Sequence, residues 1–209
     1  MLNNLSTLTL LMSLLTILAV TDGCTSIKQA SLEIHYYTIE YDPPLPAKDA
    51  QRPYSINIEQ FQTSPLYDSN RIVFKNDEYL RDEYIYHKWR AHPGELVSFF
   101  LARDFLETGR FKAIFYADAS AHHTHLITGV VEDFYQQASN AGEAILSLTI
   151  TLFDKTRRGS GDPVMMQKKY SLDVAVEESG PSGLAKAMSR AMQQLSQDII
   201  NDVYDQLKK

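Results

Sequence analysis

The sequence has little cysteine and no excess of basic charge. Its 209 residues include one cysteine, Cys24, and a single cysteine cannot form a disulfide within its own chain. The sequence therefore excludes a small domain held together by disulfides. Its 20 Lys and Arg side chains are outnumbered by 26 Asp and Glu, which gives a formal net charge of −6. Because domains that bind nucleic acid are usually basic, we expect no nucleic-acid partner.

Several enzyme motifs are also missing. The sequence has no Gly-x-x-x-x-Gly-Lys phosphate loop, so we do not expect the chain to hydrolyse ATP by itself. It has no Gly-x-Ser-x-Gly turn of a hydrolase, and Gly159-Ser160-Gly161 falls in a predicted hairpin loop. We therefore expect a protein that is not an enzyme and that binds no cofactor.

Three histidines stand close together in the sequence: His122, His123 and His125. Zinc sites usually combine two separated pairs of ligands, with a cysteine or a carboxylate among them, and this cluster has neither feature. We interpret it as a polar loop that leads into a strand, and we expect no metal site. A weak site for a divalent cation is the alternative. A deep pocket with a nucleophile beside these histidines would instead indicate an enzyme.

Two further groups of charged residues have simple explanations. Four carboxylates alternate with Arg81 and tyrosines, as on the solvated face of a hairpin; they are Asp77, Glu78, Asp82 and Glu83. A pair of carboxylates that act as acid and base is the alternative. Arg157 and Arg158 lie in a predicted loop between two strands, where they either form a basic surface or contact anionic lipid headgroups.

The longest apolar run lies at the amino terminus and is followed by the single cysteine. Residues 5–20 are apolar except for Ser and Thr. This run is shorter than the about 20 residues that a membrane-spanning helix needs, but it suits the core of a secretory signal peptide. We predict a signal peptide over residues 1–23, cleavage before Cys24, and a lipidated tether over residues 24–30. An uncleaved amino-terminal helix anchor is the alternative.

The position of Cys24 resembles that of the acylated cysteine in bacterial lipoproteins. In these proteins a diacylglyceryl group is attached to the cysteine sulfur, and the new amino terminus is then acylated. Each buried CH₂ group contributes about 0.8 kcal/mol, so two or more acyl chains give stable anchoring. Thr25 follows the cysteine, where Asp would retain an enterobacterial lipoprotein in the inner membrane. We therefore expect the covalent lipid on Cys24 to hold the protein on the periplasmic side of the outer membrane.

Alternating apolar residues, turn residues and prolines indicate one folded domain over residues 31–209. Strands are predicted at 31–41, 54–61, 71–75, 79–89, 112–116, 125–136, 144–152 and 164–176. Helices are predicted from His92-Pro93 to Gly109 and over residues 182–207. Runs of strands with two helices predict an α+β fold, with a mainly antiparallel sheet and two amphipathic helices packed on one face.

Both predicted helices have apolar stripes. In the first, Leu96, Phe99, Phe100 and Leu106 share a face, which indicates a helix packed on a sheet. In the second, apolar residues recur at spacings of three and four, and we interpret the methionines among them as core residues. A groove for lipid or for a partner is the alternative. Trp89 precedes the first helix and is interpreted as a core residue, with an exposed docking role as the alternative.

Four segments of the sequence together resemble a known family. They are the tyrosine-rich Tyr36-Tyr-Thr-Ile-Glu-Tyr41, Ile56-Asn-Ile58, Arg71-Ile-Val73, and Tyr84-Ile-Tyr86-His-Lys-Trp89 at the entry to a helix. With the preceding Cys24 and the closing amphipathic helix, these segments resemble the ABC-type transport auxiliary lipoproteins. The resemblance covers residues 31–207, which is nearly the whole chain after the predicted signal peptide.

This resemblance implies a non-enzymatic lipoprotein of intermembrane lipid transport, of the MCE/Pqi type. The expected partners are an MCE-domain protein and its inner-membrane ABC transporter complex, together with the membrane and the phospholipid that moves between the membranes. Tyr37, Tyr84 and Trp89 belong to the family pattern, which implies structural or docking roles for them. An envelope assembly or secretion-pilot lipoprotein that moves no lipid is the alternative function.

Overall fold

The computed structural model describes residues 32–118, 120–138, 142–156 and 163–208. The chain divides between Glu33 and Ile34, and the elements described below belong to the second unit, Ile34–Lys209, which is compact. They are β1 (His35–Tyr37), β2 (Arg52–Ile58), β3 (Gln62–Thr63), β4 (Arg71–Lys75), β5 (Asp82–Trp89), α2 (Pro93–Glu107), β6 (Phe111–Tyr116), β7 (His125–Gln137), β8 (Glu143–Asp154), β9 (Val164–Ala175) and α3 (Pro181–Gln206). The predicted signal peptide, Cys24, the predicted tether, Arg157, Arg158 and Gly159-Ser160-Gly161 lie outside the described residues.

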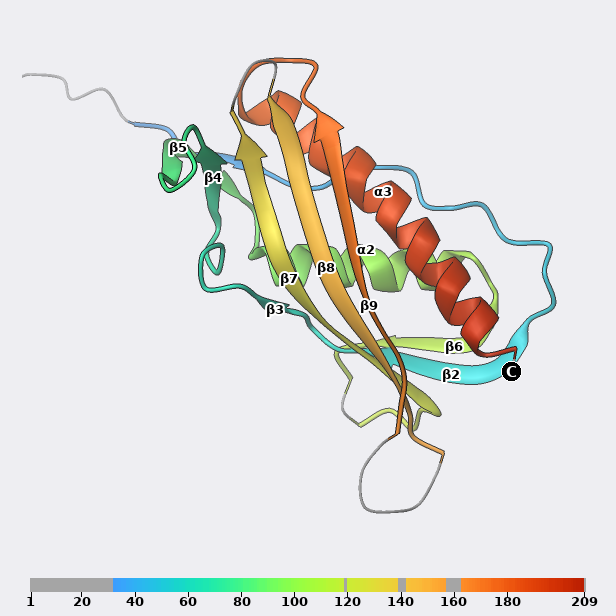
Figure 1. The fold of residues 1–209 in the computed structure, drawn as a ribbon. Helices are drawn as coiled ribbons and strands as arrows, with labels where there is room; N and C mark the ends of the chain where they lie inside the picture. The colour runs from blue at the N-terminus through green and yellow to red at the C-terminus, as the bar shows by residue number, and fades with distance from the viewer. Residues whose placement is uncertain (1–31, 119, 139–141, 157–162, 209) are drawn as a thin grey trace, which may run out of the picture. The chain divides into compact units, whose positions relative to one another are not determined.

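Three long strands, β7, β8 and β9, form one side of the sheet, and β9 pairs only with β8 among the described strands (Figure 1). β7, β8 and β9 are consecutive in the chain and pair antiparallel along their length. β2, β3 and β4 follow one another along the other edge of β7, and each of them runs parallel to it. β6 extends the sheet beyond β2, whereas β5 and then β1 extend it beyond β4. The β2 and β6 pair therefore lies near the start of β7, and the β4 and β5 pair lies near its end.

The prediction of a mainly antiparallel sheet was wrong, because the sheet is mixed. The described strands form eight pairings, of which five are parallel and three are antiparallel. Parallel neighbours need a crossover connection, and the chain between β2 and β7 provides one that contains α2. Alternation of apolar residues shows which face of a strand is buried, but not the direction of the strand beside it.

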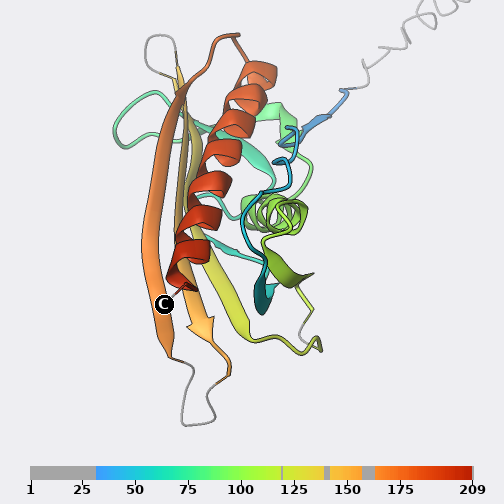
Figure 2. The same ribbon diagram turned by 90° about the vertical axis from the view of Figure 1, so that its right-hand side faces the viewer.

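Both helices lie on the same side of the long strands (Figure 2). α3 packs on β8 and β9, whereas α2 packs on β6 and β7 and touches α3. The apolar side chains of β8 alternate accordingly, and the buried ones that face the helices are Ala144, Leu146, Leu148, Ile150 and Leu152. The stripe of α3 is buried against them, at Leu184, Met188, Met192, Leu195, Ile199, Val203 and Leu207. In the part of the chain that the structure describes, neither helix has an apolar stretch long enough to cross a membrane.

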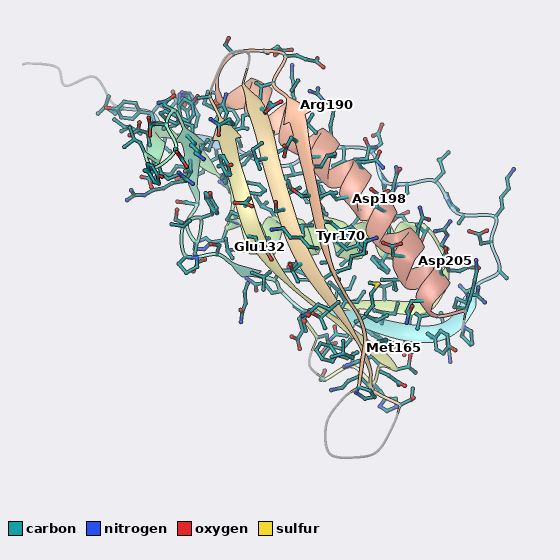
Figure 3. The ribbon with its side chains drawn as sticks, viewed as in Figure 1. Glu132, Met165, Tyr170, Arg190, Asp198 and Asp205 are labelled. Carbon is teal, nitrogen blue, oxygen red and sulfur yellow. The ribbon has the colours of Figure 1, made fainter. Side chains whose placement is uncertain are left out.

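The opposite face of the long strands carries several polar side chains that contact one another across the strands. Ser147 Oγ on β8 and Ser171 Oγ on β9 lie 2.9 Å apart. Glu132, labelled on β7 in Figure 3, forms an ion pair with Lys169 at 2.5 Å. The hydrogen bond from Lys169 lowers the pKa of the Glu132 carboxyl. Cross-strand pairs of this kind stabilise the pairing of the strands.

Candidate functional site

α2 carries more apolar side chains than the sheet covers. Leu96 and Phe100 are buried, but Phe99 and Leu106 are 51% and 58% exposed. The prediction that all four side chains pack on the sheet was therefore wrong for Phe99 and Leu106. β6 beneath the helix has six residues, and no further strand lies beside it among the described residues to cover these two side chains.

The exposed side chains line a groove between α2 and β6. One cavity of about 270 Å³ is lined by Phe99, Ala102, Arg103, Leu106, Ile114 and Tyr116. A second cavity of about 250 Å³ lies toward the start of α2 and shares Phe99 and Tyr116 with the first. Because these two rings line both cavities, the two cavities form one site, which we call the α2–β6 groove. Its lining is mainly apolar, which is the character of a binding surface for an apolar partner.

Aromatic contacts hold the wall of the groove in place. The Phe99 ring stands edge-on to Phe100 and to Tyr116, with ring centroids 5.5 and 5.9 Å apart. The Tyr116 hydroxyl lies 3.2 Å from Ser98 Oγ, and Ser98 Oγ donates to the Gly94 carbonyl. A preformed wall of this kind has less side-chain entropy to lose when it binds a partner.

A buried ionic network lies beneath the groove. Arg103 lines the groove and donates from Nη2 to Asp104 Oδ1 at 2.8 Å, and Asp104 is 1% exposed. The Tyr41 hydroxyl donates to Asp104 Oδ2 at 2.7 Å, and the Arg103 guanidinium stacks on the Tyr41 ring. Burial, together with the charge of Asp104, raises the pKa of the Tyr41 phenol far above its usual range, so Tyr41 remains a donor. The Asp104 carboxylate is thereby paired on both oxygens, as a buried charge requires.

The same segment joins the two helices. The Glu40 amide donates to Ser189 Oγ on α3 at 2.9 Å, and Gln193 Nε2 on α3 donates to the Asp42 carbonyl at 3.3 Å. Tyr41, between them, bonds to Asp104 on α2. The chain at 40–42 therefore joins α2 to α3.

The edge of β6 next to the groove is open. β6 pairs with β2 on one edge, and among the residues that the structure describes no strand pairs with its other edge. Ile114 and Tyr116, which line the groove, belong to this strand. An open edge offers main-chain hydrogen bonds, and an adjacent apolar groove receives side chains. This combination is the chemistry by which sheets bind extended peptides through strand addition.

The residues of the family pattern lie elsewhere in the domain. The Tyr37 hydroxyl lies 3.0 Å from His87 Nδ1, and the Tyr84 hydroxyl donates to Gln136 Oε1 at 3.2 Å. These contacts connect β1 to β5 and β5 to β7. Trp89 is 1% exposed, so its ring belongs to the core, in agreement with the core interpretation. None of Tyr37, Tyr84 and Trp89 lines the α2–β6 groove.

The three histidines have different surroundings. His122 is exposed, and His123 Nδ1 lies 2.7 Å from the Ala121 carbonyl oxygen. His125 is buried, with its ring 4.8 Å from that of Tyr54. Within 32–118, 120–138, 142–156 and 163–208, no three His, Cys, Asp or Glu side chains are placed to hold a metal ion.

The carboxylates between β4 and β5 make local contacts. Asp77 Oδ1 accepts a hydrogen bond from the Tyr79 amide, which is a turn contact. Glu83 forms an ion pair with Arg71 on the neighbouring strand, and both side chains are exposed. These are the contacts of a solvated hairpin, and they bring no two carboxylates together as an acid and a base.

Sequence reasoning did not identify the α2–β6 groove. The available signal was the width of the apolar stripe on α2, which also includes Val97, Leu101 and Phe105. A stripe of that width covers more of a helix than one sheet face buries. Which of its side chains remain exposed depends on where β6 ends, and that is a property of the tertiary structure.

Proteins of known structure share this fold. The crystal structure of a protein from Xanthomonas campestris superposes with a TM-score of 0.71 at 14% identity, covering 83% of this chain and 95% of that chain. A second, uncharacterised protein superposes with a TM-score of 0.65 at 12% identity, covering 82% of this chain and 99% of that chain. A hypothetical protein from Chlamydia trachomatis superposes with a TM-score of 0.52 at 10% identity, covering 75% of this chain and 98% of that chain. At these identities the likeness establishes the fold and not the function.

The sequence itself gives the family. No curated protein matches the sequence. The family model of the ABC-type transport auxiliary lipoprotein component matches residues 37–200. This range runs from the end of β1 into α3 and includes both sides of the α2–β6 groove. The chain therefore belongs to the family of ABC-type transport auxiliary lipoprotein components.

Proposed function

We propose that the protein is an outer-membrane-anchored periplasmic lipoprotein, the auxiliary and docking component of an ABC–MCE system that moves phospholipid between the inner and outer membranes. The family match over residues 37–200 carries this proposal, because it makes the chain an auxiliary component of an ABC transporter. The proposed role is non-enzymatic. ATP hydrolysis belongs to the transporter, and this chain holds a partner close to the outer membrane.

The amino-terminal residues provide the anchor in this proposal. Residues 1–23 direct secretion and are removed, Cys24 carries the lipid, and residues 24–30 connect it to the folded domain. Several acyl chains give an attachment that a single chain does not. Thr25 after the cysteine supports the outer membrane as the place of attachment.

The α2–β6 groove is the surface where we propose that the MCE-domain protein docks. The occupant is an extended segment of that protein with an apolar side chain. The open edge of β6 provides main-chain hydrogen bonds, and Phe99, Leu106 and Ile114 receive the apolar side chain. An auxiliary component must bind its transporter, and this groove combines an open strand edge with exposed apolar area.

Crosslinking in intact cells, followed by pull-down of the full-length lipoprotein, tests the docking surface. The test variant is Leu106→Ser and the matched control is Val164→Ser, because both side chains are 58% exposed and Val164 lies at the start of β9, outside the groove lining. We expect an MCE-domain protein with the wild type and with Val164→Ser, and several-fold less of it with Leu106→Ser. Equal recovery from all three proteins would refute docking at the groove.

A Cys24→Ser variant tests the anchor separately. We expect this variant to leave the membrane fraction, and an unchanged membrane fraction would refute lipidation at Cys24.

The identity of the protein recovered in the pull-down tests the transport role. Recovery of a secretion or cell-wall complex, with no MCE-domain protein, would refute lipid transport and favour the assembly or secretion-pilot function.

A further inference from the structure

A second group of exposed apolar side chains lies on β1, on β5 and in the turn between β4 and β5. Its members are Tyr36, Tyr79, Leu80, Ile85 and Tyr86, which we call the β1–β5 patch. Tyr79 and Ile85 are the most exposed, at 86% and 76%. Single exposed apolar side chains are common on protein surfaces, but a group of them at one end of a domain indicates a contact surface.

Three members of the patch, Tyr36, Ile85 and Tyr86, lie on the paired strands β1 and β5, and the other two lie in the turn before β5. β1 runs parallel to β5, with Tyr36 beside Lys88, and the turn after β4 leads directly into β5. The register between β4 and β5 shifts along the strand, so β5 contains an irregularity between Glu83 and Lys88. Ile85 lies in this irregular stretch, where a bulge turns a side chain away from the sheet.

The chain enters the domain at the same end. The second unit begins at Ile34, one residue before β1. Ile34 is the tenth residue after Cys24. Because an extended chain advances by no more than about 3.6 Å per residue, Ile34, one residue before β1, lies within about 36 Å of Cys24. A lipid on Cys24 therefore keeps β1, and the patch that is built on it, close to the bilayer surface.

The chemistry of the patch suits a lipid surface. Tyrosine rings combine an apolar body with a hydroxyl group and are enriched where a bilayer meets water. Residues 71–90 carry five Lys and Arg and four Asp and Glu, whereas the whole chain has a net charge of −6. Arg90 lies over the Tyr36 ring at 5.4 Å and places a cation beside the patch. Anionic lipid headgroups therefore repel this end of the domain less than the rest of it.

We propose that the β1–β5 patch rests on the bilayer that holds the lipid anchor, and that this second contact sets the orientation of the domain. The inference rests on the proposed lipidation of Cys24. A lipid chain and an apolar patch are two signals of the kind that together give a stable attachment. β5 and β6 lie near opposite ends of the long strands (Figures 1 and 2). With the patch on the bilayer, the β6 end points away from the membrane, toward a periplasmic partner.

A fluorophore at one position tests this orientation. The chain has no cysteine besides Cys24, whose sulfur is occupied in the lipoprotein, so one introduced cysteine is labelled alone. The test position is Ile85→Cys. Leu45→Cys is the matched control, because both side chains are exposed and aliphatic and Leu45 lies beside α3 in the segment before β2. Each full-length lipoprotein is incorporated into vesicles of phosphatidylethanolamine and phosphatidylglycerol that contain a headgroup-region quencher.

We expect the label at position 85 to be quenched at least twofold more strongly than the label at position 45. Equal quenching at the two positions would overturn the inference. Adding Tyr79→Ser to the Ile85→Cys protein should weaken the quenching and leave the vesicle-bound fraction unchanged, because the lipid anchor remains. Unchanged quenching in this double variant would contradict a role for the patch.

Two outcomes separate the anchor from the patch. If the lipoprotein does not float with the vesicles, the proposed anchoring fails and the inference fails with it. If it floats with the vesicles and the label at position 85 stays unquenched, the anchoring stands and the patch does not touch the bilayer. A label that is shielded only when the MCE-domain protein is added would show a protein contact in place of a lipid contact.

Discussion

The two helices of the domain both carry apolar stripes, but they bury them to different extents. Every member of the α3 stripe, from Leu184 to Leu207, is buried. On α2, Phe99 and Leu106 remain exposed. The difference arises from the sheet rather than from the helices. α3 lies on two strands of 12 residues each, whereas α2 lies over the six residues of β6 and part of β7.

The two helices therefore have different roles. A stripe that is buried completely contributes its apolar area to the free energy of folding. A stripe that is buried in part leaves apolar area in water, which is available to a partner. Substitutions along α3 should therefore change stability, and substitutions of the exposed residues of α2 should change binding with little effect on stability.

The largest expected effect concerns the difference in burial between α3 and α2. Leu195→Ala on α3 should lower the free energy of unfolding by about 2–5 kcal/mol, because it removes a buried side chain and leaves a cavity. Leu106→Ala removes the same atoms from α2, but its side chain is 58% exposed. That substitution should change the free energy of unfolding by less than about 0.5 kcal/mol. Urea denaturation measures the free energy of unfolding of both variants. Similar losses in the two would contradict the different roles of α3 and α2.

The next effect concerns the start of α2. A Cβ atom on Gly94 would lie 2.2 Å from the Phe61 carbonyl oxygen, so Gly94→Ala must displace the helix or the strand region beside it. We expect a loss of about 1–3 kcal/mol in the free energy of unfolding. Ser182→Ala is the matched control, because Ser182 is also the second residue of its helix and is exposed. Thermal unfolding compares the stability of the two variants. A Gly94→Ala protein that is more stable than the wild type would contradict the close approach of Gly94 to the Phe61 carbonyl oxygen.

A smaller effect is expected where the chain joins the two helices. Tyr41→Phe removes the hydrogen bond from the phenol to Asp104 Oδ2, while Arg103 continues to pair with Oδ1. The free energy of unfolding should fall by about 1–2 kcal/mol, because the bond is made to a buried charge. Tyr79→Phe, at an exposed position, serves as the control. No loss in Tyr41→Phe, measured by urea denaturation, would show that the network does not hold α2.

The smallest effect is a dependence on pH at the start of β7. Burial lowers the pKa of His125 below its ordinary value of about 6.5, against the opposing charge of Asp154. The unfolded chain therefore takes up a proton at a higher pH than the folded chain. The free energy of unfolding should fall as the pH drops below about 6.5 and level off below the pKa of the folded state.

Substitution of His125 isolates this contribution. His125→Gln should lose the part of the pH dependence that lies just below pH 6.5, whereas His122→Gln, at an exposed position, should keep it. Urea denaturation at pH 7.5, 6.5 and 5.5 measures both. An unchanged pH dependence in His125→Gln would show that another group is responsible.

Much of the local structure was predictable from the sequence. The strand Arg71–Lys75 was predicted at its observed bounds, and the first helix, predicted to begin at His92-Pro93, begins at Pro93. The second helix, predicted over residues 182–207, begins one residue earlier, at Pro181. Proline suits the first helical turn because its missing N–H has no partner there in any helix. The apolar face of β8 follows from the alternation of its residues, since alternation is a local property of a strand. β3, with two residues, was too short to show any alternation.

The candidate site was less predictable. Tyr37, Tyr84 and Trp89 were singled out by their pattern, and they serve to connect strands or fill the core. Phe99 and Leu106 were placed on the packed face of a helix, and they line the groove instead. A helical periodicity groups residues on a face, but the extent of the surface opposite that face decides how much of it is buried.

The sequence by itself determined where the helices and the long strands lie and which face of α3 and β8 is apolar. Periodicity, prolines and turn residues act within a few neighbouring residues, so one chain segment is enough to show them. The tertiary structure alone decided that β2, β3 and β4 run parallel to β7 and that the sheet stops beside α2. Those outcomes depend on contacts between segments far apart in the chain, which set both the direction of pairing and the apolar surface that remains exposed.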